Sequence, residues 1–263
     1  MFAERTQSVP ALERGLAILE HLTKCRYGLT LSQLTRHLAL PKSSVHCLLL
    51  TFERRGYLYR DEPSGRYRLG LRVCDLANTA LEGIQLREQA GPFLSRLRTT
   101  TGLTGHMAIL EGGEVVLIEK LEAPGFRVNS WIGKRMDLHC TALGKSLLAY
   151  LPDEQVEALV RSRGMLRHND NTIGSIRKLK QELERVRKQG YSVDDEEEEI
   201  NVRCIGAPIL NTRNEAIAAI SIAGTTAEID AETRDGLIAK VKDAAAAIAS
   251  QLMQKDETIS VAD

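Results

Sequence analysis

The sequence lacks the marks of a membrane-spanning or secreted protein. None of its stretches reaches the roughly eighteen uncharged apolar residues that are needed to cross a bilayer. The segment from Met1 to Pro10 contains no apolar core of a secretory signal. We therefore expect a cytoplasmic protein that has no membrane partner.

Cysteine is also scarce. The five cysteines are odd in number and never spaced as C-x-x-C: Cys25, Cys47, Cys74, Cys140 and Cys204. This pattern favours reduced thiols over a disulfide framework or a zinc ribbon. His139, Cys140 and Cys204 would bind a transition metal only if the fold brought them together. The acidic run from Asp194 to Glu199 lacks the spacing of an EF-hand and resembles an ordinary solvated run. The sequence therefore assigns no metal and no cofactor.

The whole chain has no net charge, but its two parts carry opposite charges. A chain of 263 residues favours two domains, and its 35 basic and 35 acidic residues balance. Residues 1–70, however, carry 11 basic and 6 acidic residues, whereas residues 71–263 carry 24 and 29. The N-terminal part is thus suited to a polyanion such as DNA, although solvated faces often produce a difference of this size.

Two short helical patterns open this basic part. The first runs from Val9 to Lys24 and places four leucines on one stripe: Leu12, Leu16, Leu19 and Leu22. The second runs from Leu31 to Leu38, and Thr30 is suited to cap its N-terminus. Both are short enough to belong to a small helical domain.

The stretch from Leu40 to Gly56 predicts a DNA-reading helix. Pro41 suits a first helical turn because its φ is fixed and it has no N–H. Apolar residues recur at the spacing of a buried stripe: Val45, Leu48, Leu49 and Phe52. Polar side chains fill the first turn: Lys42, Ser43, Ser44 and His46. With the two preceding helices this makes a helix-turn-helix, whose polar turn is presented to the major groove.

A basic hairpin follows and predicts a wing. Residues 57–59 and 66–69 alternate as strands around a turn that contains Pro, Ser and Gly. Arg60, Arg66 and Arg68 lie in this hairpin, so we expect it to contact the phosphate backbone, with Arg66 entering the minor groove. Taken alone, the hairpin would more often be a solvated basic surface, but after a helix-turn-helix a wing is the better interpretation.

The remaining chain predicts a linker helix and an α+β domain. One helix is expected over 71–89 and a short one over 92–100, followed by strands over 104–110, 114–121 and 126–131. Helices over 141–150, after Pro152 and over 173–188 precede strands over 191–194, 204–210 and 216–223 and a helix over 231–253. This order indicates a mostly antiparallel sheet. The expected divisions are 1–70, a linker at 71–90, a second domain at 91–254 and a disordered tail at 255–263.

The segment from His139 to Lys145 predicts part of a binding site. It passes from a strand end into a helix, where free N–H groups and the positive dipole end can hold an anion. Thr141 can cap this helix, and the amides of Ala142 and Leu143 can hold a carboxylate.

Several motifs together resemble the IclR family of bacterial transcription regulators. They are VPALERGLAILEHL, LPKSSVHCLLLTFERRGYLYRD and SGRYRLG in the first part, then HCTALGKSLLAYLP, GYSVDDEEE, RCIGAPI and AIAAISIAG. The likeness extends from about Ser8 to Gln251. It implies an N-terminal winged helix-turn-helix, a linker helix and a C-terminal GAF-like domain that binds a small effector, usually an organic acid or aromatic catabolite. It also implies a homodimer or a homotetramer built from dimers.

The resemblance also implies effector contacts at five positions: Asp194, Val202, Cys204, Ser221 and Ala223. Without it, a serine or cysteine inside an apolar strand is more often a core residue. Ala223 stands where some acid-binding relatives have a second serine, which suggests a less polar ligand. Trp131 and Met136 are expected at the border of the pocket.

Two further departures from the family pattern concern single positions. Cys47 replaces an arginine that is common in the recognition helix, so operator preference cannot be carried over. Ile200 and Asn201 stand in place of a glycine after the acidic run, which leaves the shape of that loop open.

The favoured function is an effector-controlled regulator that binds an inverted-repeat operator of double-stranded DNA. Lys42, Ser43, Ser44 and His46 would contact bases or phosphates, and Gln33 and Arg36 would lie near the backbone. One alternative is an enzyme that acts on a small acid or ester through Cys204 or Cys140, with His139 as base, although the sequence contains no known catalytic signature. Another is a winged helix that binds proteins. We expect no catalytic residues.

Overall fold

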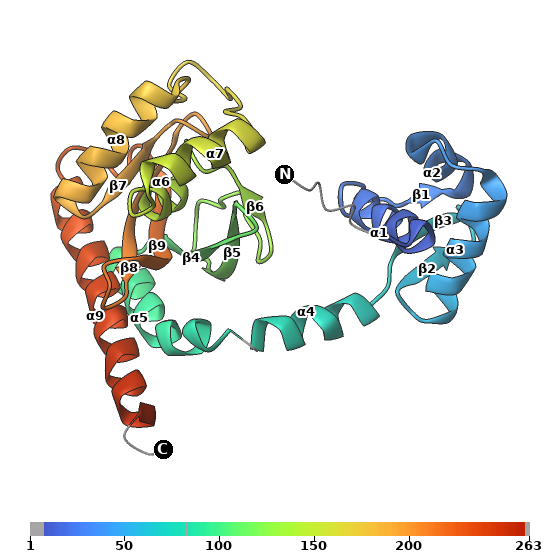
Figure 1. Cartoon of the computed structure of the whole chain (residues 1–263), viewed down its shortest axis with the longest axis horizontal. Coiled ribbons are helices and arrows are strands. Elements are labelled where there is room, and N and C mark those ends of the chain that lie inside the picture. Colours follow the sequence, from blue (N-terminus) through green and yellow to red (C-terminus); the bar gives the residue numbers. More distant parts are fainter. Residues whose placement is uncertain (1–7, 83, 261–263) are drawn as a thin grey trace, which may run out of the picture. The chain divides into compact units, whose positions relative to one another are not determined.

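The computed structural model describes residues 8–82 and 84–260, which divide into two compact units between Glu82 and Ile84 (Figure 1). The first unit contains α1 (Pro10–Thr23), β1 (Leu29–Thr30), α2 (Leu31–Leu38), α3 (Lys42–Arg54), β2 (Leu58–Asp61), β3 (Arg66–Leu69) and α4 (Arg72–Glu82). Its strands form an antiparallel sheet in the order β1-β3-β2. This confirms the winged helix-turn-helix and adds β1, a two-residue strand too short to be predicted.

The start of α2 follows from its own residues. The hydroxyl of Thr30 accepts a hydrogen bond from the backbone N–H of Gln33 (3.3 Å), and the side chain of Gln33 accepts one from the N–H of Thr30 (2.9 Å). This reciprocal cap satisfies two N–H groups that a helix end leaves free. The predicted cap at Thr30 is therefore confirmed.

The core of the first unit differs from the predicted leucine stripe of α1. Ile18 and Leu22 are buried, whereas Leu12 is 62% and Leu16 is 45% exposed. Gly15 explains the difference, because a Cβ at this position would lie 3.1 Å from the Phe52 ring of α3. The small residue lets α3 approach, so the face that contains it is buried instead.

The linker prediction was wrong in its boundaries. The single helix expected over 71–89 and the short one over 92–100 are instead α4 and α5 (Gln85–Thr101), and α5 has Pro92 in its interior. Ala90, Leu94 and Leu97 of α5 are buried in the second unit. Burial of this face outweighs the hydrogen bond that a proline removes from the helix interior.

The second unit is an antiparallel sheet between two helical layers (Figure 1). Its strands are β4 (Thr104–Glu111), β5 (Glu114–Leu121), β6 (Arg135–Met136), β7 (Ser192–Asp195), β8 (Val202–Leu210) and β9 (Ala216–Thr225), in the order β6-β5-β4-β9-β8-β7. One core lies between this sheet and the helices α5 and α9 (Arg234–Ser260). The other lies against α6 (Ala142–Leu148), α7 (Asp153–Arg163) and α8 (Ile176–Gln189). The predicted α+β class with a mostly antiparallel sheet is confirmed.

One prediction about this unit was wrong. Residues 126–131 form a loop rather than a strand, and the short strand β6 follows them. Helix α9 extends to Ser260, into the tail that the sequence predicts to be disordered. Residues 261–263 lie outside the described part of the chain.

Among the helices of the described residues, we find none that combines the length and apolarity needed to cross a bilayer.

Candidate functional site

The first turn of α3 is an exposed polar surface. Lys42, Ser43 and His46 are exposed and Ser44 is half-buried, whereas Val45 and Leu49 are fully buried. The helix is thus anchored by one face and leaves the other free. Cys47, at the position where the family commonly has an arginine, is also exposed.

Three residues that were predicted to contact DNA are hydrogen-bonded or partly buried within the first unit. Arg66 donates a hydrogen bond from Nη1 to the carbonyl of Gly28 (2.9 Å) and lies 3.4 Å from Oε1 of Gln33. Gln33 also caps α2, so both side chains fasten the wing to the start of that helix. Arg68 is half-buried, whereas Arg36 is exposed. Arg66 and Gln33 therefore have a structural role that sequence reasoning missed.

A cavity of about 40 Å³ lies in the second unit, next to the start of α6. It is lined by seven of the eight residues predicted for the effector: Thr141, Ala142, Leu143, Asp194, Val202, Cys204 and Ser221. Ala223 lies opposite Cys204 in the register of β8 and β9, but it is not part of the lining. Met136 lines the cavity as expected, whereas Trp131 is 58% exposed and lies outside it.

The cavity has a second polar wall that the sequence did not reveal. It comprises His106, Val128, Asn129, Ser130, Lys134, Glu198 and Glu199. His106 Nε2 lies 2.9 Å from the hydroxyl of Ser130. Burial lowers the pKa of His106 to about 3, with smaller contributions from Lys120 and Lys134, so this imidazole is neutral. Reading residues 126–131 as a strand concealed part of this wall, because the segment that contains Val128, Asn129 and Ser130 is a loop that reaches the cavity.

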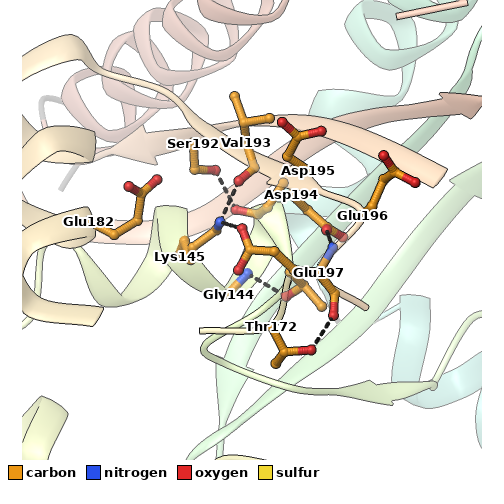
Figure 2. Close-up of polar contacts among 12 residues, drawn as sticks. Gly144, Lys145, Thr172, Glu182, Ser192, Val193, Asp194, Asp195, Glu196 and Glu197 are labelled. Atoms are coloured by element: carbon orange, nitrogen blue, oxygen red, sulfur yellow. Dashed lines mark hydrogen bonds and ion pairs between the residues drawn. The ribbon is translucent and has the colours of Figure 1, made fainter. Parts of the chain in front are cut away.

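A buried lysine joins the two segments that supply the first wall (Figure 2). Lys145 of α6 is wholly buried and donates hydrogen bonds to the carboxylate of Glu197 and to the carbonyl of Val193. Ser192 donates a hydrogen bond to the carbonyl of Ala142 (2.6 Å), and Thr172 donates one to the carbonyl of Glu197 (2.7 Å). The bonds of Lys145 and Ser192 tie α6 to β7 and to the loop that follows β7, and the bond of Thr172 ties that loop to the segment between α7 and α8. The sequence had suggested a solvated acidic run, but part of this run is buried and bonded to α6.

Asp194 is a buried carboxyl in this wall. It is 2% exposed, and its Oδ1 accepts a hydrogen bond from the backbone N–H of Glu197 (2.8 Å). Burial raises its pKa to about 7, and the carboxylates of Glu197 and Glu198 act in the same direction. The N–H of Glu197 and the ammonium of Lys145 oppose the shift. Near neutral pH this side chain can either donate or accept a hydrogen bond.

The loop after the acidic run keeps a turn that usually requires glycine. Asn201 has φ 66°, in the left-handed region that asparagine tolerates better than most residues. Its N–H donates to Oε2 of Glu196 (2.8 Å). Asn201 thus performs the conformational role of the glycine that the family pattern places near this position.

The thiols and His139 are poorly arranged for nucleophilic catalysis. Burial raises the pKa values of Cys140 and Cys204, and nearby carboxylates contribute, so neither thiol is activated as a thiolate. His139 Nε2 is bonded to the carbonyl of Leu166 (3.0 Å). Within the described residues, His139, Cys140 and Cys204 also do not group as metal ligands.

Asp194→Asn should change how stability depends on pH. The carboxyl has a higher pKa in the folded chain (about 7) than in the unfolded chain (3.8), so its stabilising contribution is complete below pH 3.8 and is lost as pH rises to about 7. We expect the variant to gain roughly 4 kcal/mol of unfolding free energy relative to wild type across this range. Urea unfolding of both proteins from about pH 4 to about 8 spans both pKa values and measures the difference. A difference that does not vary with pH would contradict the shift.

Two family models match the chain. The model of the IclR helix-turn-helix domain matches residues 11–62, and the model described as "Bacterial transcriptional regulator IclR C-terminal" matches residues 78–250. The first match covers the exposed turn of α3, and the second covers the whole lining of the cavity.

Named relatives and solved structures agree with these matches. The chain is 34% identical over 223 residues to the HTH-type transcriptional regulator XynR of Escherichia coli (strain K12), which covers 84% of this chain and 88% of the relative. It is 33% identical over 246 residues to the HTH-type transcriptional repressor AllR of Salmonella typhi, covering 92% and 89%. A crystal structure of an IclR homolog complexed with 4-hydroxybenzoate, from Microbacterium hydrocarbonoxydans, matches with a TM-score of 0.80 at 26% identity, covering 93% of this chain and 99% of that chain.

Proposed function

The chain belongs to the IclR family of bacterial transcriptional regulators, and we propose that it binds an inverted-repeat operator as a homodimer under the control of a small organic acid. The helix-turn-helix and the effector-binding domain of the family are both present. The observation that carries the proposal is the cavity beside Ala142, where a polar wall and a helix start face the same space.

DNA binding is supported by the exposed first turn of α3. Within the described part of the chain, the side chains of Lys42, Ser43 and His46 are exposed and make no hydrogen bond or ion pair. Residues 1–70 also carry the basic excess of the chain. We propose that these side chains and Ser44 contact the major groove, and that Arg36 and Arg68 contact phosphates. As a DNA-binding regulator, the protein would act in the cytoplasm.

Self-association is supported by apolar side chains that the first unit does not bury. Val9 and Leu12 are 63% and 62% exposed, and Leu16 lies on the same helix. Leu71 and Leu76, at and within α4, are 84% and 55% exposed. Exposed apolar clusters of this kind commonly mark protein interfaces. We propose that they join two copies of the chain, and that two such dimers form a tetramer.

An acid effector is supported by the donors around the cavity. Lys134 brings a positive charge, Ser130 and Ser221 bring hydroxyl groups, and Asp194 in its protonated form can donate a hydrogen bond. We propose that the carboxylate lies near Thr141, Ala142 and Leu143. Val202 and Cys204 would contact the less polar part of the ligand, with Ala223 behind them. The 4-hydroxybenzoate held by the Microbacterium homolog supports a ligand of this class.

Catalysis is not part of the proposal. Related proteins are named transcriptional regulators or repressors. The raised pKa values of Cys140 and Cys204 also disfavour the thiolate that a cysteine nucleophile requires.

Lys42→Ala should weaken DNA binding and make it less sensitive to salt. If the ammonium contacts a phosphate, DNA binding by the variant releases about one counterion fewer than binding by the wild type. The slope of log affinity against log salt should therefore become shallower by about 1. The measurement is fluorescence anisotropy with the DNA upstream of the protein's own gene, between 50 and about 300 mM salt. Lys188→Ala, at an exposed position in the last turn of α8, is the matched control and should leave the slope unchanged. Equal slopes for the wild type and Lys42→Ala would exclude this contact.

An acid effector should raise the melting temperature of the second unit, and more so at low pH. A panel of monocarboxylates that includes 4-hydroxybenzoate can be screened by thermal shift, where a ligand at 100 times its Kd adds about 2.7 kcal/mol. Affinity should be higher at pH 6 than at pH 8, because ionised Asp194 repels an anion. Ser221→Ala should weaken binding, whereas Ser95→Ala, exposed on α5, should not. Tighter binding at pH 8 would rule out an anion beside Asp194.

A further inference from the structure

Three potential metal ligands meet beside the cavity without lining it. They are the carboxylate of Asp137, the thiol of Cys140 and the imidazole of His168, whose ligand atoms all lie within 4.8 Å of one another. His168 Nε2 lies 2.8 Å from Oδ2 of Asp137. Cys140 is fully buried, whereas the side chains of His168 and Asp137 are 26% and 38% exposed. The cluster therefore has a closed end and an end that an ion can reach from solvent.

Both segments of this cluster are held in place by other contacts. Asp137 and Cys140 share one turn, which is fixed by a hydrogen bond from the hydroxyl of Thr141 to the carbonyl of Asp137 (2.7 Å). The backbone N–H of His168 donates to the hydroxyl of Thr172 (3.1 Å), and that hydroxyl donates to the carbonyl of Glu197. The three ligands are thus presented by backbone that is already positioned, which lowers the entropic cost of binding an ion.

We propose that Asp137, Cys140 and His168 bind one Zn²⁺ ion, with water as the fourth ligand. One sulfur, one imidazole nitrogen and one carboxylate oxygen form a donor set that zinc accepts and that Mg²⁺ and Ca²⁺ do not favour. Zinc takes such ligands at about 2.0–2.3 Å, which places them about 3.3–3.8 Å apart in a tetrahedron. The three ligand atoms lie within 4.8 Å of one another, so shifts of about an ångström would bring them to these separations. The carboxylate and the thiolate together neutralise the charge of the ion.

Zinc at this position would add a direct link between two segments that the chain otherwise connects through hydrogen bonds and apolar packing. His168 belongs to the segment between α7 and α8, and Cys140 directly precedes Thr141, which lines the cavity. An ion held between them would therefore stiffen one wall of the effector site. Cys140 is a protonated thiol in the metal-free chain, so zinc must displace its proton and should bind more weakly as pH falls.

The test uses the full-length protein in a Cys47→Ser/Cys74→Ser background, which removes the two exposed thiols. After treatment with a chelator and desalting, Zn²⁺ is titrated in competition with a chromophoric chelator, and Co²⁺ is added separately to detect thiolate-to-metal charge transfer. We expect one tightly held Zn²⁺ per chain and a thiolate band with Co²⁺.

Cys140→Ser and His168→Gln should each lower zinc affinity by at least about tenfold, and Cys140→Ser should also abolish the thiolate band. His168→Gln keeps the test decisive if the buried Cys140→Ser variant fails to fold, because His168 is partly exposed. Cys204→Ser, which alters a thiol of the cavity, should retain zinc. Less than one tightly bound ion per chain, or undiminished affinity in folded His168→Gln, would overturn the proposal.

Discussion

The ion pair between Lys145 and Glu197 is the constraint on which the second unit depends. Neither charge is stable alone in the interior, because an unpaired buried ion costs several kcal/mol. Lys145 is wholly buried and Glu197 is 7% exposed, so each needs the other, and Lys145 also needs the carbonyl of Val193. The pair therefore fixes the distance between α6 and the loop after β7. Helix α6 and its N-cap carry Thr141, Ala142 and Leu143, and β7, which leads into this loop, carries Asp194.

This constraint also shapes the chemistry of the cavity. Holding the acidic loop against α6 removes Asp194 from water, and this burial is the main reason for its raised pKa. Lys145 is close enough to moderate the shift but is committed to Glu197. The positive charge that faces the cavity comes instead from Lys134, whose ammonium is bonded to the carbonyl of Asn129 (2.8 Å) and lies near Glu198. A ligand thus meets a basic loop on one side and a carboxyl of variable charge on the other.

Local sequence signals predicted much of the fold and of the cavity, and long-range packing explains the features that were missed. The caps at Thr30 and Thr141 were predictable because a cap needs only residues three positions apart. The stripe of α1 was misjudged because Gly15, which seemed neutral, allows Phe52 to approach. Lys145 and Glu197 are 52 residues apart, and no periodicity shows that a lysine inside a helix will pair with one of six acidic residues. Seven of the cavity residues were identified only through the family resemblance or a predicted helix start, whereas His106 and Lys134 had no local signature.

Hydrogen exchange of the segment Asp194–Val202 in Lys145→Met tests the central role of the ion pair most directly. In the wild type, the amides of Glu196, Glu197 and Val202 donate hydrogen bonds within this segment and should exchange slowly. Removing Lys145 leaves Glu197 as an unpaired buried charge, so these amides should exchange at least about tenfold faster, while amides of β4 keep their protection. The double variant Lys145→Met/Glu197→Met should restore most of the protection, because neither charge remains. Unchanged exchange in Lys145→Met would show that the loop is held by other contacts and would contradict the account.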